Sequence, residues 1–434
     1  MIDDVRMTPI ALVFTLLMSG LTILLPRRYA IYPIIVTVCY VTIGQQIIVF
    51  SLHFSIFRII IFMGWLRIII RRDITPIQLN VIDKTIIWWV AVSLLMRLLN
   101  DPTVSDLTEH SGYAYNAVGT YFLFRFYLID FADINRIVKF TALLIVPLAI
   151  LMLIENFTGR NIFSFFGGVP EITMIRDGRM RCQGPFRHPI IAGTFGATLM
   201  PLMVGFFFKD NSARLIAVMG FISATIITAV SSSSGPLMAY LFGIVGFAMW
   251  PFRNNMRLIR WGILFAVIGL HMIMKDPVWF IIARVADITG GTGWYRSQLI
   301  NQAIKYFSEW WLFGTKYTKH WMQENVKLSN PNMTDITNQY IWEGVGGGLI
   351  KLILFISVIV LSFRAVGLSL KALEDKPFAI KIMIWSIGVA LLAHVVSYIS
   401  VVYFDQIIVV WFLLLSMMSA LPKGSECFSI KEEI

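Results

Sequence analysis

The sequence predicts an all-α membrane protein, a polytopic helical bundle with about twelve or thirteen transmembrane helices. Hydrophobic residues make up 57% of the 434-residue chain and mean hydropathy is +0.75, whereas a soluble domain is about half apolar. Apolar runs of about 17 to 25 residues, long enough to cross about 30 Å of hydrocarbon as a helix, recur along most of the chain. The runs are continuous, not alternating, which disfavours a transmembrane barrel. We therefore expect one integral membrane domain over 1–434 and no soluble domain.

The expected spans follow one another with mostly short connections. They lie near 8–25, 29–50, 54–70, 85–99, 113–131, 137–154, 189–208, 214–231, 235–251, 258–274, 338–363, 379–400 and 405–421. The segment 55–72 carries Arg58 and Arg67 and is also compatible with an amphipathic helix in the membrane interface. The first run has a weak basic flank and no small-residue cleavage site, so we expect a retained span and not a signal peptide.

The composition argues against metal, nucleotide and disulfide chemistry. Cys39, Cys182 and Cys427 fall in a predicted span, a loop and the C-terminal tail, with no C-x-x-C spacing. The six histidines are scattered, and the chain has neither a D-x-D motif nor a P-loop. The net charge of +11 fits contact with anionic lipid better than nucleic-acid binding, because no basic run lies on a soluble domain. We expect no metal and no cofactor.

Lysine and arginine in the short connections predict the orientation. Five basic connections fall on one side when the spans alternate, and that side is expected to be cytoplasmic: 71–84, 135–139, 209–214, 253–257 and 371–381. The outer side then receives an acidic connection at 100–112 and two longer segments, 155–188 and 275–337. Both long segments are therefore expected to face away from the cytoplasm.

The outer segment 155–188 is rich in arginine and breaks this charge rule. Its arginines are Arg160, Arg176, Arg179, Arg181 and Arg187. A guanidinium binds phosphate oxygens bidentately and stays charged at any relevant pH, so the segment predicts an anionic ligand at the outer membrane surface. The alternative is a set of solvated loop charges. Arg187 and His188 precede the span that begins near 189, where the headgroup of a lipid would lie, and the outer turn "SSSSGP" (231–236) offers hydroxyls or is an ordinary turn.

Three motifs together resemble the superfamily of O-antigen ligases and Wzy-type polysaccharide polymerases. "RCQGPFRHP" is similar to its R-x-x-G-x-F-x-x-P element, "YRSQLINQAIKYFSEWWLFG" to its arginine-led helix, and "NQYIWEGVGGG" to its glycine-rich entry into a span. The resemblance covers about residues 179–363. It implies a GT-C-like bundle that transfers glycan from a polyprenyl-diphosphate donor to an acceptor hydroxyl, without metal, at the periplasmic face of the bacterial cytoplasmic membrane.

The same resemblance assigns catalytic residues. It puts Arg181 and Arg296 at the family's two essential arginines. The chain departs from the family in two places, with Ser233, Ser234 and Gly235 where many members have Ser-Arg-Gly, and with Thr337 and Asn338 where the ligases have His-Asn.

The histidine usually proposed as the base is therefore absent. We expect Asp335 to replace it, because a carboxylate near arginines stays ionised. Asp335 could instead cap the next helix or pair with a lysine. Glu343 is the second candidate, although it could also reach the membrane surface without a role.

The residues expected to bind the diphosphate or the glycan are Arg179, Arg187, His188, Tyr295, Asn338 and Glu343. Aromatic residues of the outer segments could stack on sugars, although interfacial belts also explain them. The implied partners are a polyprenyl-diphosphate-linked oligosaccharide, membrane lipid, and chain-length regulator or export proteins.

The missing histidine favours a polymerase of exopolysaccharide or O-antigen repeat units over an O-antigen ligase acting on lipid A core. A transporter or flippase for lipid-linked glycans is the alternative of another class. Transporters tend to show internal repeats and ionisable groups deep in their spans. We find no repeat at half length, and the polar residues crowd into two outer segments. A purely structural assembly partner would leave the outer arginines unexplained.

Overall fold

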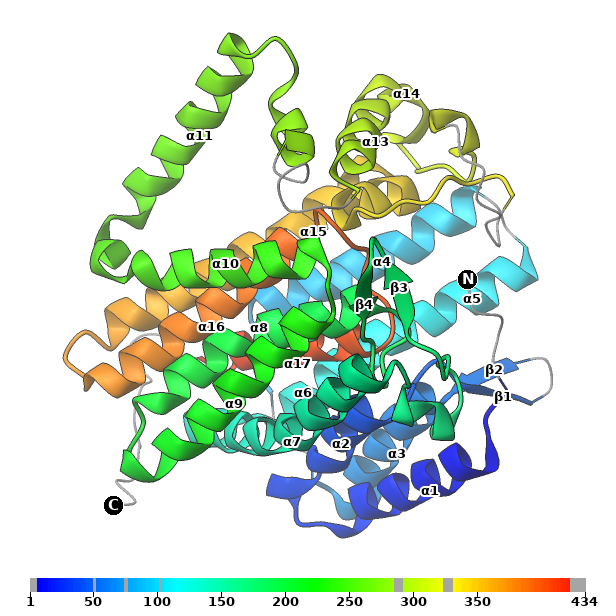
Figure 1. Cartoon of the computed structure of the whole chain (residues 1–434), viewed down its shortest axis with the longest axis vertical. Coiled ribbons are helices and arrows are strands. Elements are labelled where there is room, and N and C mark those ends of the chain that lie inside the picture. The colour runs from blue at the N-terminus through cyan, green and yellow to red at the C-terminus, as the bar shows by residue number, and fades with distance from the viewer. Residues whose placement is uncertain are drawn as a thin grey trace.

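The computed structural model describes residues 6–49, 52–73, 77–100, 103–284, 292–322 and 331–421. These residues are mostly helical, with two short two-stranded hairpins (Figure 1). The all-α prediction is confirmed. Six helices of the described chain are long and apolar enough to cross a membrane: α7 (Phe131–Thr158), α8 (Pro189–Phe207), α9 (Asn211–Val230), the Trp250–Ile273 stretch, α15 (Gln339–Ala372) and α16 (Phe378–Ser397). This fits a membrane bundle, and the finer count of spans stays a prediction.

The other α-helices and the π-helix η2 are not among these six, except that α11 is the main part of the Trp250–Ile273 stretch. They are α1 (Pro9–Leu24), α2 (Tyr32–Tyr40), α3 (Ile56–Arg71), α4 (Val81–Asn100), α5 (Val104–Ala114), η2 (Tyr115–Gly119), α6 (Thr120–Tyr127), α10 (Ser234–Ala248), α11 (Met256–Ile273), α13 (Gly293–Lys305), α14 (Phe307–Trp310) and α17 (Gln406–Ser419). Capping side chains set several starts, since Thr8, Asp130, His188 and Asp210 each accept a hydrogen bond from a backbone N–H of the following turn.

The expected span 29–50 is wrong in its second half. The helix ends at Tyr40, and the chain continues into a hairpin of β1 (Gln46–Val49) and β2 (Leu52–Ser55). The Gln45 side chain holds the chain in this extended path by donating to the backbone carbonyls of Phe166 and Gly167, at 2.9 and 3.1 Å. Hydropathy alone cannot separate such an apolar strand segment from a helix.

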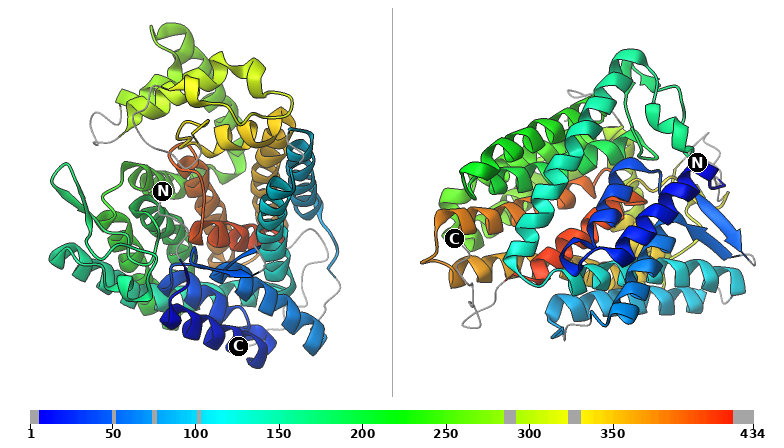
Figure 2. Two further views of the ribbon diagram at one scale, coloured as in Figure 1. Left: turned by 90° about the vertical axis from the view of Figure 1, so that its right-hand side faces the viewer. Right: turned by 90° about the horizontal axis from the view of Figure 1, so that it is seen from below.

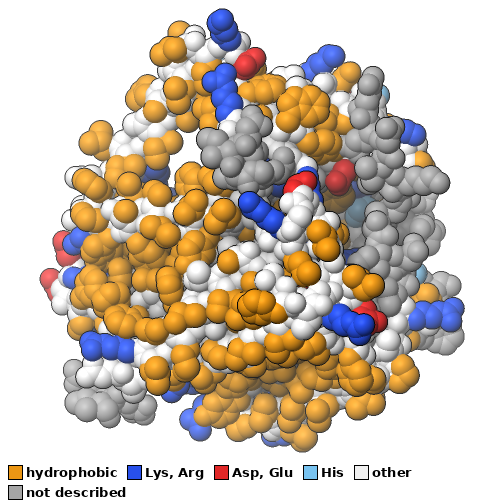
Figure 3. Space-filling model, in the orientation of Figure 1, with side chains coloured by type: hydrophobic (Ala, Val, Ile, Leu, Met, Phe, Trp, Pro, Cys, Tyr) orange, Lys and Arg blue, Asp and Glu red, His pale blue; other side chains and the backbone are white. Residues whose placement is uncertain are grey.

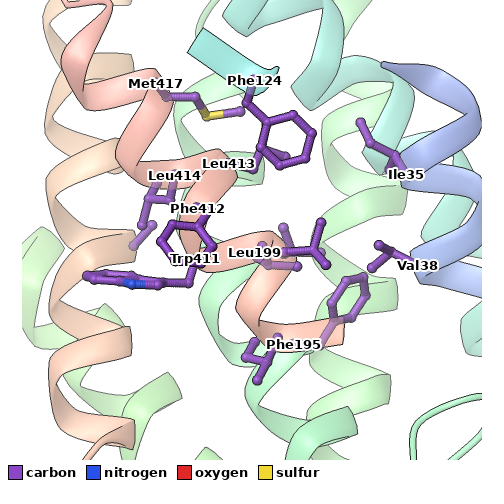
Figure 4. Packing of buried hydrophobic residues seen from close by; sticks show 14 of the residues in the cluster. Ile35, Val38, Phe124, Phe195, Leu199, Trp411, Phe412, Leu413, Leu414 and Met417 are labelled. Atoms are coloured by element: carbon purple, nitrogen blue, oxygen red, sulfur yellow. The ribbon is translucent and has the colours of Figure 1, made fainter. Parts of the chain in front are cut away.

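The core of the bundle surrounds α17, almost all of whose residues are buried. Figure 4 shows side chains of α17 packed against Phe195 and Leu199 of α8, Phe124 of α6, and Ile35 and Val38 of α2. A helix that is apolar all round belongs in such a position. On the face seen in Figure 3, hydrophobic side chains cover most of the surface, as expected for a lipid-facing bundle. Helix α11 stands off from the other helices (Figure 1) and buries none of its residues.

Hydrogen bonds gather several helix ends at one end of the bundle, which faces the viewer in Figure 2, left. Gln339 at the start of α15 donates its N–H to the Tyr398 carbonyl (2.8 Å), and its side-chain oxygen accepts from the Tyr403 N–H (2.8 Å). Gln406 at the start of α17 donates to the Pro185 carbonyl (2.9 Å). We call this the site end, and it comprises 159–188, 231–235, 331–339 and 398–406.

Helix α15 is broken close to the site end. Gly348 has φ 74°, a conformation that favours glycine. The segment that follows α14 fills the break. The Thr315 N–H donates to the Val345 carbonyl (2.9 Å), and the Leu349 N–H donates to the Trp311 carbonyl (2.7 Å). Backbone groups freed inside a membrane protein need such partners. The break thereby fixes the α13–α14 segment onto the bundle.

The segment 55–72 forms α3, which packs against α1 through a buried arginine. The Arg67 guanidinium donates to the carbonyls of Thr22, Ile23 and Leu25, at 2.6–2.9 Å, and pairs with Asp73 at 3.0 Å. Its side chain is 2% exposed. Arg67 therefore satisfies the last carbonyls of α1, which a helix leaves without intrahelical partners.

Replacing Arg67 with lysine should destabilise the protein, because an ammonium on a flexible stem cannot reproduce the planar fork. We expect a loss of roughly 2 kcal/mol, the order found for hydrogen bonds to charged groups. The measurement is the melting temperature in detergent. The control is Arg71→Lys at the exposed end of α3, and equal melting temperatures for both variants would show that Arg67 does not hold α1.

Candidate functional site

The arginine-rich outer segment contains a β-hairpin that the sequence analysis missed. Strands β3 (Met174–Arg176) and β4 (Arg179–Arg181) pair antiparallel, with Met174 opposite Arg181. Asp177 and Gly178 connect them with φ of 51° and 72°. Two central residues with positive φ are typical of a type I′ turn, for which Asp-Gly is a preferred sequence. The Asp-Gly dipeptide was the sequence signal from which this hairpin could have been predicted. The turn places Arg176 and Arg179 on either side of it.

A buried carboxylate holds this segment to the bundle. Glu155, in the last turn of α7, accepts hydrogen bonds from the N–H groups of Gln183 (3.0 Å) and Gly184 (2.8 Å) and from the Thr173 hydroxyl (3.2 Å). The Cys182 N–H donates to the Val230 carbonyl at the end of α9 (3.0 Å). Arg181, between these anchors, therefore has a fixed backbone.

The Arg181 side chain points into the site end and is only 8% exposed. Its Nη2 donates to the Ser233 hydroxyl at 2.8 Å, and Ser233 in turn donates to the Ser231 carbonyl at 3.0 Å. The serine turn therefore contacts Arg181, and the chain has this contact where the resembled family often has an arginine. The buried Nε of Arg181 has no hydrogen-bond partner among the described residues.

Arg296 reaches the same region from α13 and is 9% exposed. Leu299 and Ala303 anchor its helix by packing into a small core with Trp310 and Trp321. Its Nε is also buried without a partner in the part of the chain that the structure describes. A buried donor left without a partner costs free energy, so both guanidinium groups are prepared for an acceptor.

The pKa shifts of Arg181 and Arg296 have the Arg176 charge as a common cause. Burial and the charges of Arg176 and Arg181 lower the pKa of Arg296 to about 10. Burial and the Arg176 charge also lower the pKa of Arg181, against the opposing effect of Asp177. The ion pairs of arginine found in the described chain involve neither Arg181 nor Arg296. The region therefore carries positive charge, which favours an anionic ligand.

His188 lies in the same field and is neutral. Burial and the charges of Arg181 and Arg176 lower its pKa to about 4. Its Nδ1 accepts from the Ile190 N–H at 3.2 Å, which makes His188 the cap of α8. The proton of the neutral ring then sits on Nε2, which can donate to a ligand.

The structure also brings Tyr295 and Asp335 together, next to Arg296. The Tyr295 hydroxyl donates to the Asp335 backbone carbonyl at 2.6 Å, and the Asp335 side chain is exposed. Asn338 caps α15 by accepting from the N–H groups of Tyr340 (2.9 Å) and Ile341 (3.2 Å), and it is buried. Asn338 therefore has a clear structural role.

For three other residues predicted for the site, Arg179, Glu343 and Arg187, the contacts found among the described residues do not include Arg181 or Arg296. Arg179 is exposed on the hairpin. Glu343 is fully buried and accepts from Trp89 (3.1 Å) and Gln339 (2.6 Å) while pairing with Lys351 at 3.1 Å. These contacts compensate its charge and give it a structural role at the break in α15.

Arg187 pairs with Asp405, whose carboxylate oxygen lies 3.2 Å from the Arg187 Nε. The sequence analysis missed Asp405, and it named Arg176 only as one of the outer charges. An acidic residue at the start of an apolar run was the signal for Asp405, as it was for Glu155 at the end of one. Within the described ranges, no group of three or more His, Cys, Asp or Glu residues is arranged to hold a metal ion.

Comparison with known proteins adds no assignment. No protein-family model matches the chain, and no curated protein matches it. The functional argument therefore rests on the site itself.

Replacing Arg296 with glutamine should make the ligand-free protein more stable. Because the pKa of Arg296 is lowered from 12.5 to about 10, its charge opposes folding at every pH below about 10, and this opposition disappears as pH rises towards 12.5. At pH 7.5 we expect a higher melting temperature for the variant. Inorganic pyrophosphate should raise the melting temperature of the wild type and not that of the variant. A less stable variant that still responds to pyrophosphate would show that Arg296 is not part of an anion site.

Proposed function

We propose that the protein is a glycosyltransferase of the polysaccharide polymerase type. It joins lipid-linked oligosaccharide repeat units into exopolysaccharide or O-antigen at the outer face of the bacterial cytoplasmic membrane. The observation that carries this proposal is the convergence of Arg181 and Arg296, from segments far apart in the sequence, with buried Nε groups that lack partners among the described residues. This supports the assignment that the resemblance predicts for the two arginines.

The position of the cluster suits a donor that carries a diphosphate on a lipid. Arg181 lies where α9 ends and α10 begins, since the neighbouring Cys182 N–H donates to Val230 and its own guanidinium donates to Ser233. Helices α8 and α9 are long and apolar enough to cross a membrane. A polyprenyl chain can then remain in the bilayer while its diphosphate reaches the arginines. Three guanidinium groups match the two or three negative charges of a diphosphate ester better than those of a neutral sugar or a single carboxylate.

The chemistry follows from the charge that develops on this leaving group. The oxygen of an acceptor hydroxyl attacks the anomeric carbon, the bond from that carbon to the phosphate oxygen breaks, and its electron pair leaves with the diphosphate. Arg181 and Arg296 stabilise the departing anion without a large rearrangement, because both are buried and already held by the hairpin and α13. Arg176, which is exposed and lies 3.6 Å from Asp177, adds positive charge at the turn. The His188 Nε2–H can donate to the same oxygens. The proton of the acceptor must go to a base, for which the sequence offers Asp335.

A transporter would need to move the diphosphate across the membrane, and a ligase would use the same donor with a lipid A core acceptor. A fixed arginine cluster at one end of the bundle suits chemistry at one surface better than transport. The buried Glu343–Lys351 pair near the break in α15 is compensated by its own neighbours, so it does not require a transport role. We therefore propose the polymerase reaction.

Lysine in place of Arg181 or Arg296 should severely impair polymer formation. Lysine keeps the charge but loses the fork, and removal of one such electrostatic donor costs about 10²–10³ in rate. The control is Arg160→Lys, because Arg160 is exposed and pairs loosely with Glu171 at 3.5 Å. The measurement is polymer formation by each variant in a strain that lacks the native protein, at equal membrane abundance.

The glycan profile of the deletion strain identifies the reaction. Single repeat units on the acceptor indicate a lost polymerase, and unattached full-length polymer indicates a lost ligase. Absence of any glycan at the outer face, with donor accumulating inside, would indicate a lost flippase. Normal polymer from both lysine variants would show that the arginines are ordinary loop charges and would contradict the proposed function.

A further inference from the structure

Asp405 is a strained residue at the site end. Its φ is 51° and its ψ is −128°, a combination that a turn normally assigns to glycine. It directly precedes α17, where an aspartate side chain would ordinarily accept a hydrogen bond from the first turn. The Asp405 side chain makes no such bond. Helix capping therefore does not explain why an aspartate stands here.

The carboxylate turns towards Arg187 instead. Its Oδ2 is buried and lies 3.2 Å from the Arg187 Nε, but the two atoms are not aligned, so Oδ2 has no hydrogen-bond partner among the described residues. The side chain as a whole is 16% exposed. Burial raises the pKa of the Asp405 carboxyl against the opposing charge of Arg187, and the lone pairs of Oδ2 stay available to another donor.

Two connections place Asp405 at the same end of the bundle as the arginine cluster. Arg187 directly precedes His188, which lies in the field of Arg181 and Arg176. On the other side, the segment 398–405 reaches the start of α10, where the Ser400 hydroxyl leaves no room for a side chain at Gly235.

Gly235 follows the serine turn whose Ser233 binds Arg181. The neighbouring Gln406 fixes the position of Asp405 by donating to the Pro185 carbonyl at 2.9 Å. The carboxylate is therefore held on a rigid part of the site end.

We infer that Asp405, and not Asp335, is the carboxylate that takes the proton of the acceptor hydroxyl during glycosyl transfer. This inference rests on the proposed function. As the hydroxyl oxygen bonds to the anomeric carbon and the diphosphate departs with the electron pair, the hydroxyl proton passes to the Asp405 carboxylate, which later releases it to water. Arg187 holds the carboxylate in position. The Asp335 side chain, in contrast, is exposed, and it is the Asp335 backbone carbonyl that accepts from the Tyr295 hydroxyl.

The strained backbone supports a functional role for Asp405. A residue in a conformation that favours glycine persists where its side chain has a use, and the strain is removed when glycine replaces it. Asp405→Gly should therefore give a protein that melts at a higher temperature but does not transfer glycan. An Asp405→Gly variant that melts at a lower temperature would overturn the argument from strain.

The decisive experiment compares Asp405→Asn with Asp335→Asn in purified protein in nanodiscs, using a radiolabelled polyprenyl-diphosphate-linked repeat unit. Asp405→Asn should bind this donor with wild-type affinity, while kcat for transfer falls by at least about 10²-fold. Asp335→Asn should retain most of its kcat. The control is Asp210→Asn, because Asp210 caps α9 at the opposite end of the bundle and asparagine caps equally well.

The outcomes separate the inference from the proposed function. Normal kcat in Asp405→Asn, or loss of kcat in Asp335→Asn alone, overturns the inference and leaves the function standing. Equal losses of donor binding and kcat in Asp405→Asn also overturn it, because Asp405 would then act only by supporting the donor site. A wild-type protein that neither binds nor transfers the donor refutes the proposed function, and the inference fails with it.

Discussion

The Glu155 carboxylate is the interaction on which the site depends. It accepts two backbone N–H groups and one hydroxyl from the outer segment, and it does so from inside the last turn of a long apolar helix. A buried carboxylate requires such compensation. Because the compensation comes from residues 173–184, the segment that carries Arg181 cannot leave the bundle without exposing an unpaired buried charge. The positive hairpin is thereby held in place next to arginines that repel it.

This arrangement explains how the chain tolerates a cluster of like charges. Burial and mutual repulsion lower the pKa of Arg296 and of Arg181, so the ligand-free cluster opposes folding. The stability comes from elsewhere, from the apolar packing around α17 and from capped or bridged helix ends such as α1 at Arg67. Free energy stored in an uncompensated positive site becomes available when an anion binds. Under the proposed function, that anion is the diphosphate, whose negative charge increases as it departs.

Hydropathy was sufficient to predict the helical membrane class, because the length of an apolar run is set by the bilayer. It failed at residues 41–49, where Gln45 and its partners stabilise an extended segment of equal hydropathy. The grouping of Arg181 with Arg296 in one site is a prediction from a family resemblance and stays a prediction. The position of Arg176 depends on the Asp177–Gly178 turn. The sequence does mark Asp405 as an acid before an apolar helix, but that pattern ordinarily indicates a helix cap and so does not single Asp405 out. Only its backbone conformation and its contact with Arg187 distinguish it.

The central claim is that Arg176, Arg181 and Arg296 bind one diphosphate. The most direct measurement is a cryo-electron microscopy map of the protein in nanodiscs with a polyprenyl-diphosphate-linked glycan. The account predicts density for two phosphates within hydrogen-bond distance of the Arg181 and Arg296 guanidinium groups, with the polyprenyl chain running into the bilayer. Diphosphate density at another place, with the two guanidinium groups unchanged and unoccupied, would contradict it.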